Sequence, residues 1–166
     1  TPSFAVRLGQ SVWVQATASG VSDITSVAIS IDGQPQTLDG FGRVRFTPAA
    51  TGHYTVVATA SDLDGATGAT TLTLKVRDPL DAVAPVVGLS NLANGTVIRT
   101  ALDLTGAVSD TNLDEYILEL RPLAGGTGST LAWGQDPVNG TLVRLDPGEW
   151  VNGAYLVRLT ATDIGG

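Results

Sequence analysis

Short runs in which apolar and polar residues alternate dominate the pattern along this chain. No window shows the i, i+3, i+4, i+7 apolar spacing of an amphipathic helix. Alternation with a period of two, bounded by glycine, proline and aspartate, predicts β-strands instead. In the first half the runs are Ser11–Ala18, Thr25–Ile31, Gln36–Leu38, Arg43–Thr47, His53–Ala60 and Thr70–Val76. In the second half they are Val86–Leu89, Thr100–Val108, Glu115–Leu120, Thr130–Trp133, Thr141–Leu145 and Tyr155–Thr162.

Dipeptides that end in glycine separate several of these runs. Asp32-Gly33 and Asp39-Gly40 predict tight turns, because glycine adopts positive φ without a steric clash. Asn94-Gly95 and Asn139-Gly140 are each followed by threonine and so match the glycosylation sequon. Asn-Gly is also typical of a hairpin turn, and we interpret both as turns.

A stretch with two prolines and two aspartates interrupts the strand pattern in the middle of the chain (RDPLDAVAP, residues 77–85). Because proline has a fixed φ and no backbone donor, such a stretch is typical of a stiff linker. We therefore predict a first domain at residues 1–77, a linker at 78–84 and a second domain at 85–166.

The two halves contain an internal repeat. Gly52–Asp62 aligns without gaps with Gly153–Asp163, and a glycine, a tyrosine, alternating aliphatic residues and a final aspartate recur in register. A repeat near 100 residues is typical of immunoglobulin-like domains. Tyr54 and Tyr155 each open the repeated strand, and we predict that each forms a tyrosine corner, with its hydroxyl bonded to a backbone carbonyl of the preceding turn.

These segments resemble the immunoglobulin-like and PKD-like repeats of large exported bacterial proteins. The resemblance lies in residues 47–76 of the first half and in residues 84–98, 104–120 and 145–166 of the second, which is similar to modules of Rhs/YD-repeat proteins and adhesins. It implies an all-β fold of two tandem immunoglobulin-like β-sandwich domains. It also implies an extracellular or cell-surface location and a spacer, display or adhesive role without catalysis.

The second half lacks a counterpart of the last strand of the first half. Asp62 is followed by a strand that runs through Val76, whereas the chain stops at Gly166, three residues after Asp163. We expect a fragment of a longer protein, and truncation, disorder or proteolysis explains the missing strand. The alternative is that another chain donates it to an open sheet edge. Either way we expect the second domain to be the less stable.

Composition narrows the classes of partner. The net charge is −7 and Lys75 is the only lysine, so nucleic acid and anionic membranes are not expected partners. There is no cysteine, which excludes disulfides and thiolate metal sites. No apolar run approaches the ~20 residues needed to cross a bilayer. The expected partners are other domains of the same parent protein, with a glycan or protein ligand as the alternative.

Aspartates form the best candidate for bound chemistry. Asp62, Asp64, Asp78 and Asp81 lie near the predicted domain junction, and calcium takes six to eight oxygen ligands of this kind from loops. The alternative is that these carboxylates cap turns through hydrogen bonds to backbone N–H groups. No cofactor other than this calcium is expected.

No pattern of an enzyme is present. His53 is the only histidine and we interpret it as a strand residue, since no G-x-S-x-G nucleophile motif accompanies it. Glu115 and Glu119 share one face of a predicted strand, which we interpret as solvated, with Leu118 and Leu120 facing inward.

Three tryptophans remain, Trp13, Trp133 and Trp150. We predict that each fills one end of a sandwich core, because the indole carries a large apolar surface. Exposure of Trp13 would instead favour carbohydrate binding. The function that follows is a non-catalytic structural spacer or stalk, and the alternative is an adhesion module that binds through loops or an open strand edge.

Overall fold

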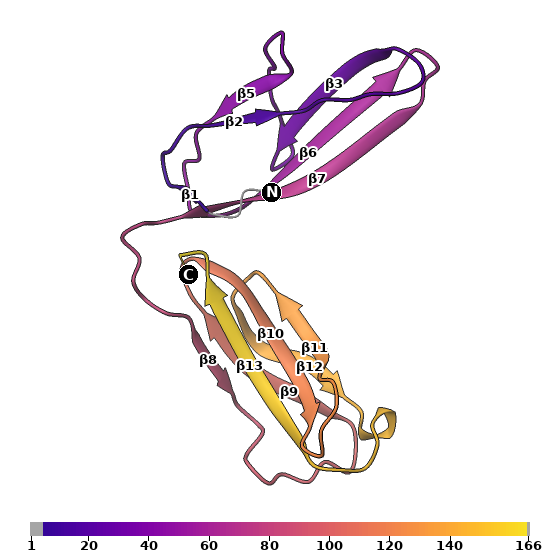
Figure 1. The fold of residues 1–166 in the computed structure, drawn as a ribbon. Coiled ribbons are helices and arrows are strands. Elements are labelled where there is room, and N and C mark those ends of the chain that lie inside the picture. Colours follow the sequence, from indigo (N-terminus) through magenta and orange to yellow (C-terminus); the bar gives the residue numbers. More distant parts are fainter. Residues whose placement is uncertain (1–4, 166) are drawn as a thin grey trace. The chain divides into compact units, whose positions relative to one another are not determined.

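The computed structural model describes residues 5–165, and these residues form β-strands joined by turns (Figure 1). The one helix among them is the single 3₁₀ turn η1 (Pro147–Glu149), which Asp146 caps with its side chain. Their contacts divide the chain into two compact units, the first reaching Asp81 and the second spanning Ala82–Ile164. The all-β class is therefore confirmed, whereas independent folding of two domains stays a prediction.

The first unit contains seven strands in two sheets. They are β1 (Val6–Arg7), β2 (Val12–Gln15), β3 (Ile24–Ile31), β4 (Gln34–Pro35), β5 (Arg43–Phe46), β6 (Gly52–Asp62) and β7 (Thr67–Arg77). One sheet has the order β1-β7-β6-β3-β4 and the other pairs β2 with β5. The third, sixth and seventh strands are neighbours, and the second and fifth pair separately. This is the strand order of an immunoglobulin-like sandwich.

The core of the first unit follows from the alternation of side chains along these strands. Val56 of β6, Ile29 and Ile31 of β3, and Leu74 and Val76 of β7 are at most 5% exposed. From the smaller sheet, one face of β2 and β5 packs against them through Val12, Val14, Val44 and Phe46. The opposite face of β2 and β5 consequently points to solvent.

The second unit contains six strands in two sheets of three. They are β8 (Val86–Leu89), β9 (Leu102–Ser109), β10 (Leu113–Pro122), β11 (Ser129–Gly134), β12 (Val138–Leu145) and β13 (Tyr155–Asp163). The sheet orders are β11-β10-β13 and β12-β9-β8. Leu104, Val108, Leu118, Leu120 and Leu145 are at most 6% exposed and form its core.

Both predicted tyrosine corners are confirmed. The Tyr54 hydroxyl donates to the Ala50 carbonyl oxygen at 3.1 Å, and the Tyr155 hydroxyl donates to the Val151 carbonyl oxygen at 2.6 Å. Each phenol ring also meets a second aromatic ring nearly edge-on, Phe46 at 5.2 Å and Trp150 at 6.3 Å between centroids. The repeat seen in the sequence is thus a repeat of structure.

The two units differ at the edge of the strand that carries the tyrosine. In the first unit β6 lies between β3 and β7, whereas β13 pairs with β10 alone among the described strands. Val56 on β6 is only 2% exposed. Val157, at the equivalent position of β13, is only half-buried. The second unit therefore leaves one side of its core less well covered.

The turn predictions hold with one exception. Asp32 and Gly33 both have positive φ, as a type I′ hairpin requires, and Asn94-Gly95 lies in a turn closed by the Thr96 N–H to the Ala93 carbonyl oxygen. The interpretation of Asn139-Gly140 as a turn is wrong, because both residues lie inside β12. The connection lies earlier, between Gly134 and Val138, where a segment containing Pro137 carries the chain from one sheet to the other.

Candidate binding surface

The four aspartates proposed for calcium lie in or beside turns. One oxygen of Asp62 accepts hydrogen bonds from the Asp64 and Ala66 N–H groups, and one oxygen of Asp78 accepts from the Leu80 N–H. Among residues 5–165, no group of three or more acidic or histidine side chains is placed to hold a metal ion. Asp62 and Asp64 lie at the hairpin end of the β6–β7 ladder, whereas Asp78 and Asp81 follow the far end of β7, so the structure does not bring the two pairs together. The geometry favours the alternative of turn capping, and calcium at these four residues stays a prediction.

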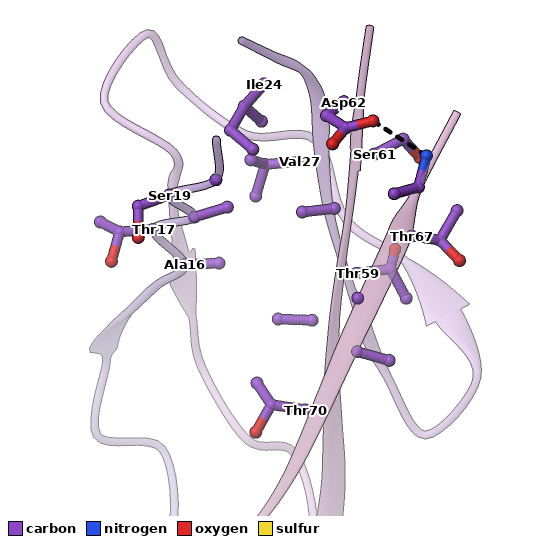
Figure 2. Close-up of a pocket in the computed structure, with 17 residues that line it drawn as sticks. Ala16, Thr17, Ser19, Ile24, Val27, Thr59, Ser61, Asp62, Thr67 and Thr70 are labelled. Atoms are coloured by element: carbon purple, nitrogen blue, oxygen red, sulfur yellow. Dashed lines mark hydrogen bonds between the residues drawn. The ribbon is translucent and has the colours of Figure 1, made fainter. Parts of the chain in front are cut away.

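A hollow of about 360 Å³ lies at one end of the first unit. Small, hydroxylated and aliphatic side chains line it, among them Ala16, Ile24, Val27, Thr59 and Thr70 (Figure 2). Its one ionisable residue is Asp62, and the hydrogen bond drawn in Figure 2 joins that carboxylate to the Ala66 backbone N–H. The hollow thus contains no pair of groups suited to acid–base chemistry.

The remaining candidates for chemistry are strand residues. His53 lies on β6 opposite Lys75 of β7, within the ladder of the first unit. On β10, Leu118 and Leu120 are buried as predicted, and Glu115 and Glu119 lie at the alternate positions, partly covered. Neither arrangement brings two carboxylates or a nucleophile and a base into a common cleft.

The tryptophans do not all fill the core. Trp150 packs against Tyr155 at the corner before β13, as predicted. The prediction is wrong for Trp13 and Trp133, which are 61% and 64% exposed. The reason is parity: Val12 and Val14 occupy the inward positions of β2, so Trp13 between them points outward.

Trp13 is part of a patch on the outer face of the smaller sheet. Trp13 lies directly opposite Arg45 and Gln15 opposite Arg43 in the β2–β5 ladder, and opposed residues share a face. Phe41, just before β5, is 72% exposed. We call the surface formed by Trp13, Gln15, Phe41, Arg43 and Arg45 the Trp13 face.

Arg43 organises this face. Its guanidinium carbon lies 5.0 Å from the centroid of the Trp13 ring and 4.8 Å from that of the Phe41 ring. These distances are those of cation–π contacts. The guanidinium also donates to the Asp39 carboxylate through Nε and Nη2, each at 3.0 Å. One arginine therefore holds two exposed rings together.

Asp39 fixes the loop that carries Phe41. Its second carboxylate oxygen accepts the N–H groups of Phe41 at 2.9 Å and Arg43 at 3.0 Å. Desolvation acts to raise the pKa of Asp39, but the Arg43 side chain and these two N–H groups outweigh it and hold the pKa below its ordinary value of 3.8. Gln15 adds a hydrogen bond of 3.1 Å to the Phe41 carbonyl oxygen. The loop is therefore tied to both strands.

Sequence reasoning found Trp13 but missed its companions. The signal was present in two four-residue runs, VWVQ and RVRF, where the polar and aromatic residues alternate with core residues. Pairing those runs would have placed Trp13, Arg43 and Arg45 on one face. Phe41 gave no such signal, because it lies outside a strand.

Comparisons with known proteins do not assign the chain to a family. No family model matches the chain, and no curated protein matches it. Among solved structures it is similar to the fibronectin(III)-like modules of Clostridium thermocellum CbhA, with 18% identity, 99% of this chain and 84% of that chain covered, and a TM-score of 0.41. It is also similar to dimeric latent PorU from Porphyromonas gingivalis, with 15% identity, 99% and 16% covered, and a TM-score of 0.29.

The strand order of the chain itself defines its class. It is an all-β protein with immunoglobulin-like sheet topology. Within residues 5–165, no helix is both long and apolar enough to span a membrane.

Proposed function

We propose that this chain is a non-catalytic structural module, a spacer that positions other domains of a larger exported bacterial protein. One observation carries the proposal: a tyrosine corner occurs twice, each time before a strand that pairs antiparallel with a long neighbouring strand, β6 with β3 and β13 with β10, in two units with separate cores. Repetition of a self-contained sandwich extends a protein without requiring a ligand. A location outside the cell belongs to the same proposal.

The ionisable side chain in the hollow of the first unit supports a non-catalytic role. Asp62, in the hollow of the first unit, accepts two backbone N–H groups and is thereby committed to a turn. An acid–base site would instead require titratable groups that converge on a cleft.

The test of the spacer role is an exchange in the parent protein. Residues 5–165 would be replaced by an unrelated pair of β-sandwiches of similar length, and the parent's activity and display would be measured. A spacer tolerates the exchange. Loss of function with normal expression and folding would overturn the proposal.

The second candidate is an adhesion module that binds a glycan or a protein. The Trp13 face favours it, because the neighbouring rings of Trp13 and Phe41 are 61% and 72% exposed. A group of exposed apolar side chains is typical of an interaction site. Immobilised full-length chain would be tested for retention of polysaccharides and of peptides. Binding that Trp13→Ala abolishes would support this candidate, whereas absence of any retained ligand would exclude it.

A further inference from the structure

The outer face of β2 and β5 combines flat aromatic rings with arginines in a strongly acidic protein. We propose that the Trp13 face binds a polysaccharide whose sugar rings carry carboxylates, that is, a uronate polymer. This inference rests on the second candidate function, the adhesion module, and assigns its ligand class.

The aromatic part of the face suits a sugar ring. Trp13 is 61% exposed on an outward position of β2, with no strand above it among the described residues. The C–H groups of a pyranose present an apolar face of similar size to an indole. Stacking the two removes apolar surface of both partners from water, which stabilises the complex.

The charged part of the face selects an anion. Arg43 is neutralised by Asp39 at 3.0 Å, but no hydrogen bond or ion pair joins the side chain of Arg45, opposite Trp13, to another residue in 5–165. A guanidinium binds a carboxylate through two parallel hydrogen bonds. Since the chain carries a net charge of −7, an available cation beside an exposed ring distinguishes this face from the acidic remainder.

The face is organised before any ligand arrives. Asp39 holds the Arg43 side chain and two backbone N–H groups, and Gln15 holds the Phe41 carbonyl. The rings therefore lose little conformational freedom on binding, which reduces the entropic cost of association.

A sugar polymer fits this geometry better than an acidic peptide. A peptide is ordered by backbone hydrogen bonds along a strand edge or by side chains in a groove. The Trp13 face consists of side chains that stand on the surface of a sheet, so its contacts are made by ring faces and a guanidinium. Stacking with charge pairing is how it would hold a ligand.

The experiment measures binding of the full chain by titration calorimetry to three probes. They are polygalacturonate, the same polymer with its carboxyls methyl-esterified, and poly-glutamate. The variants are Trp13→Ala, Arg45→Gln and Arg45→Lys. Matched controls are Trp133→Ala, which removes the exposed tryptophan of the second unit, and Arg99→Gln, which removes an exposed arginine outside the strands.

We expect polygalacturonate to bind and both the ester and poly-glutamate to bind more weakly. Trp13→Ala and Arg45→Gln should each weaken polygalacturonate binding about tenfold or more, which corresponds to roughly 1.4 kcal/mol. Arg45→Lys should retain part of the affinity, and the two controls should retain all of it.

The remaining outcomes separate the ligand class from the binding function. Equal binding of polygalacturonate and its ester, lost in Trp13→Ala but kept in Arg45→Gln, would overturn the acidic class and leave glycan adhesion standing. Preference for poly-glutamate would overturn the sugar in favour of an acidic peptide. Binding that Trp133→Ala removes would place the site elsewhere, and no binding of any probe would contradict the proposal at this face.

Discussion

At the scale of single residues, two phenol hydroxyls close the corners of the two units. The Tyr54 hydroxyl donates to the Ala50 carbonyl oxygen and accepts the Ala50 N–H, while the Tyr155 hydroxyl donates to the Val151 carbonyl oxygen. Such a bond contributes about 0.5–1.5 kcal/mol net, and more when its loss leaves a buried group unpaired. These hydroxyls therefore stabilise the turns before β6 and β13.

The first prediction removes these hydroxyls one at a time. Tyr54→Phe and Tyr155→Phe should each lower the free energy of unfolding by about 1–2 kcal/mol, measured by urea denaturation. Tyr116→Phe is the matched control, because no hydrogen bond joins its hydroxyl to another described residue. Equal effects of all three substitutions would contradict a specific role of the corners.

Asp39 provides a prediction on pH. Because its folded pKa lies below its unfolded value, the carboxylate contributes stability that is complete above the unfolded pKa and is lost as pH falls through the folded pKa. The melting midpoint of the wild type should therefore exceed that of Asp39→Asn near neutral pH, and the difference should shrink below about pH 4. A difference that stays constant down to low pH would indicate that the charge of Asp39 has no role.

At the scale of elements, close approach of strands in the second unit requires a glycine. A Cβ added to Gly106 in the centre of β9 would lie 2.5 Å from the Gly88 carbonyl oxygen and 2.8 Å from Leu142 Cδ1. A Cβ added to Gly88 of β8 would have nothing within 4 Å. Gly88 thus has room for a larger side chain, whereas Gly106 does not.

The second unit should respond accordingly. Gly106→Ala should destabilise it by roughly 1–3 kcal/mol or more, as overpacking of a filled site does, while Gly88→Ala should leave its stability within about 0.5 kcal/mol. Urea denaturation of the two variants, side by side, checks the difference. Similar stability of both would show that β8 and β9 separate at little cost.

The sequence predicted the elements better than it predicted the exposed surface. Period-two alternation located most of the strands, because a strand with one buried face repeats every second residue. It missed the two-residue strand β1, and the run predicted at Gln36–Leu38 lies just after β4 (Gln34–Pro35). The turn predicted from the Asn139-Gly140 dipeptide was wrong, because pairing of β12 with β9 overrides the local turn propensity. The prediction of buried tryptophans was wrong for Trp13 and Trp133. Alternation divides the residues of a strand between two faces, but it does not show which face is buried until the partner strands are known.

At the scale of the whole molecule, each unit has its own core, and this predicts two unfolding transitions. Ile29 in the first unit is 2% exposed and Leu118 in the second is 0% exposed. Substitution of either by alanine costs about 2–5 kcal/mol. Calorimetry should show Ile29→Ala moving one transition and Leu118→Ala the other.

The second unit should melt first in the wild type, because Val157 is only half-buried and β10 alone among the described strands pairs with β13. A single transition that both variants move would show that the two cores unfold as one.

Calcium is tested on the same scale. Since Asp62 and Asp78 already accept backbone N–H groups, we expect equal melting midpoints with calcium and with EDTA. A midpoint raised by calcium would contradict this expectation. Because Asp64 and Asp81 lie at opposite ends of the β6–β7 ladder, Asp64→Asn and Asp81→Asn, made separately, would show which pair binds the ion.

One edge of β13 pairs with no described strand, and this has a consequence for refolding. The sequence of β13 repeats that of β6, and β6 pairs with β7 in the first unit. Every copy of the chain therefore contains a strand that can pair with this sequence. At high protein concentration, a β7 segment released from one molecule can therefore add to β13 of its neighbour. The outcome would be domain-swapped oligomers whose yield rises with concentration during renaturation.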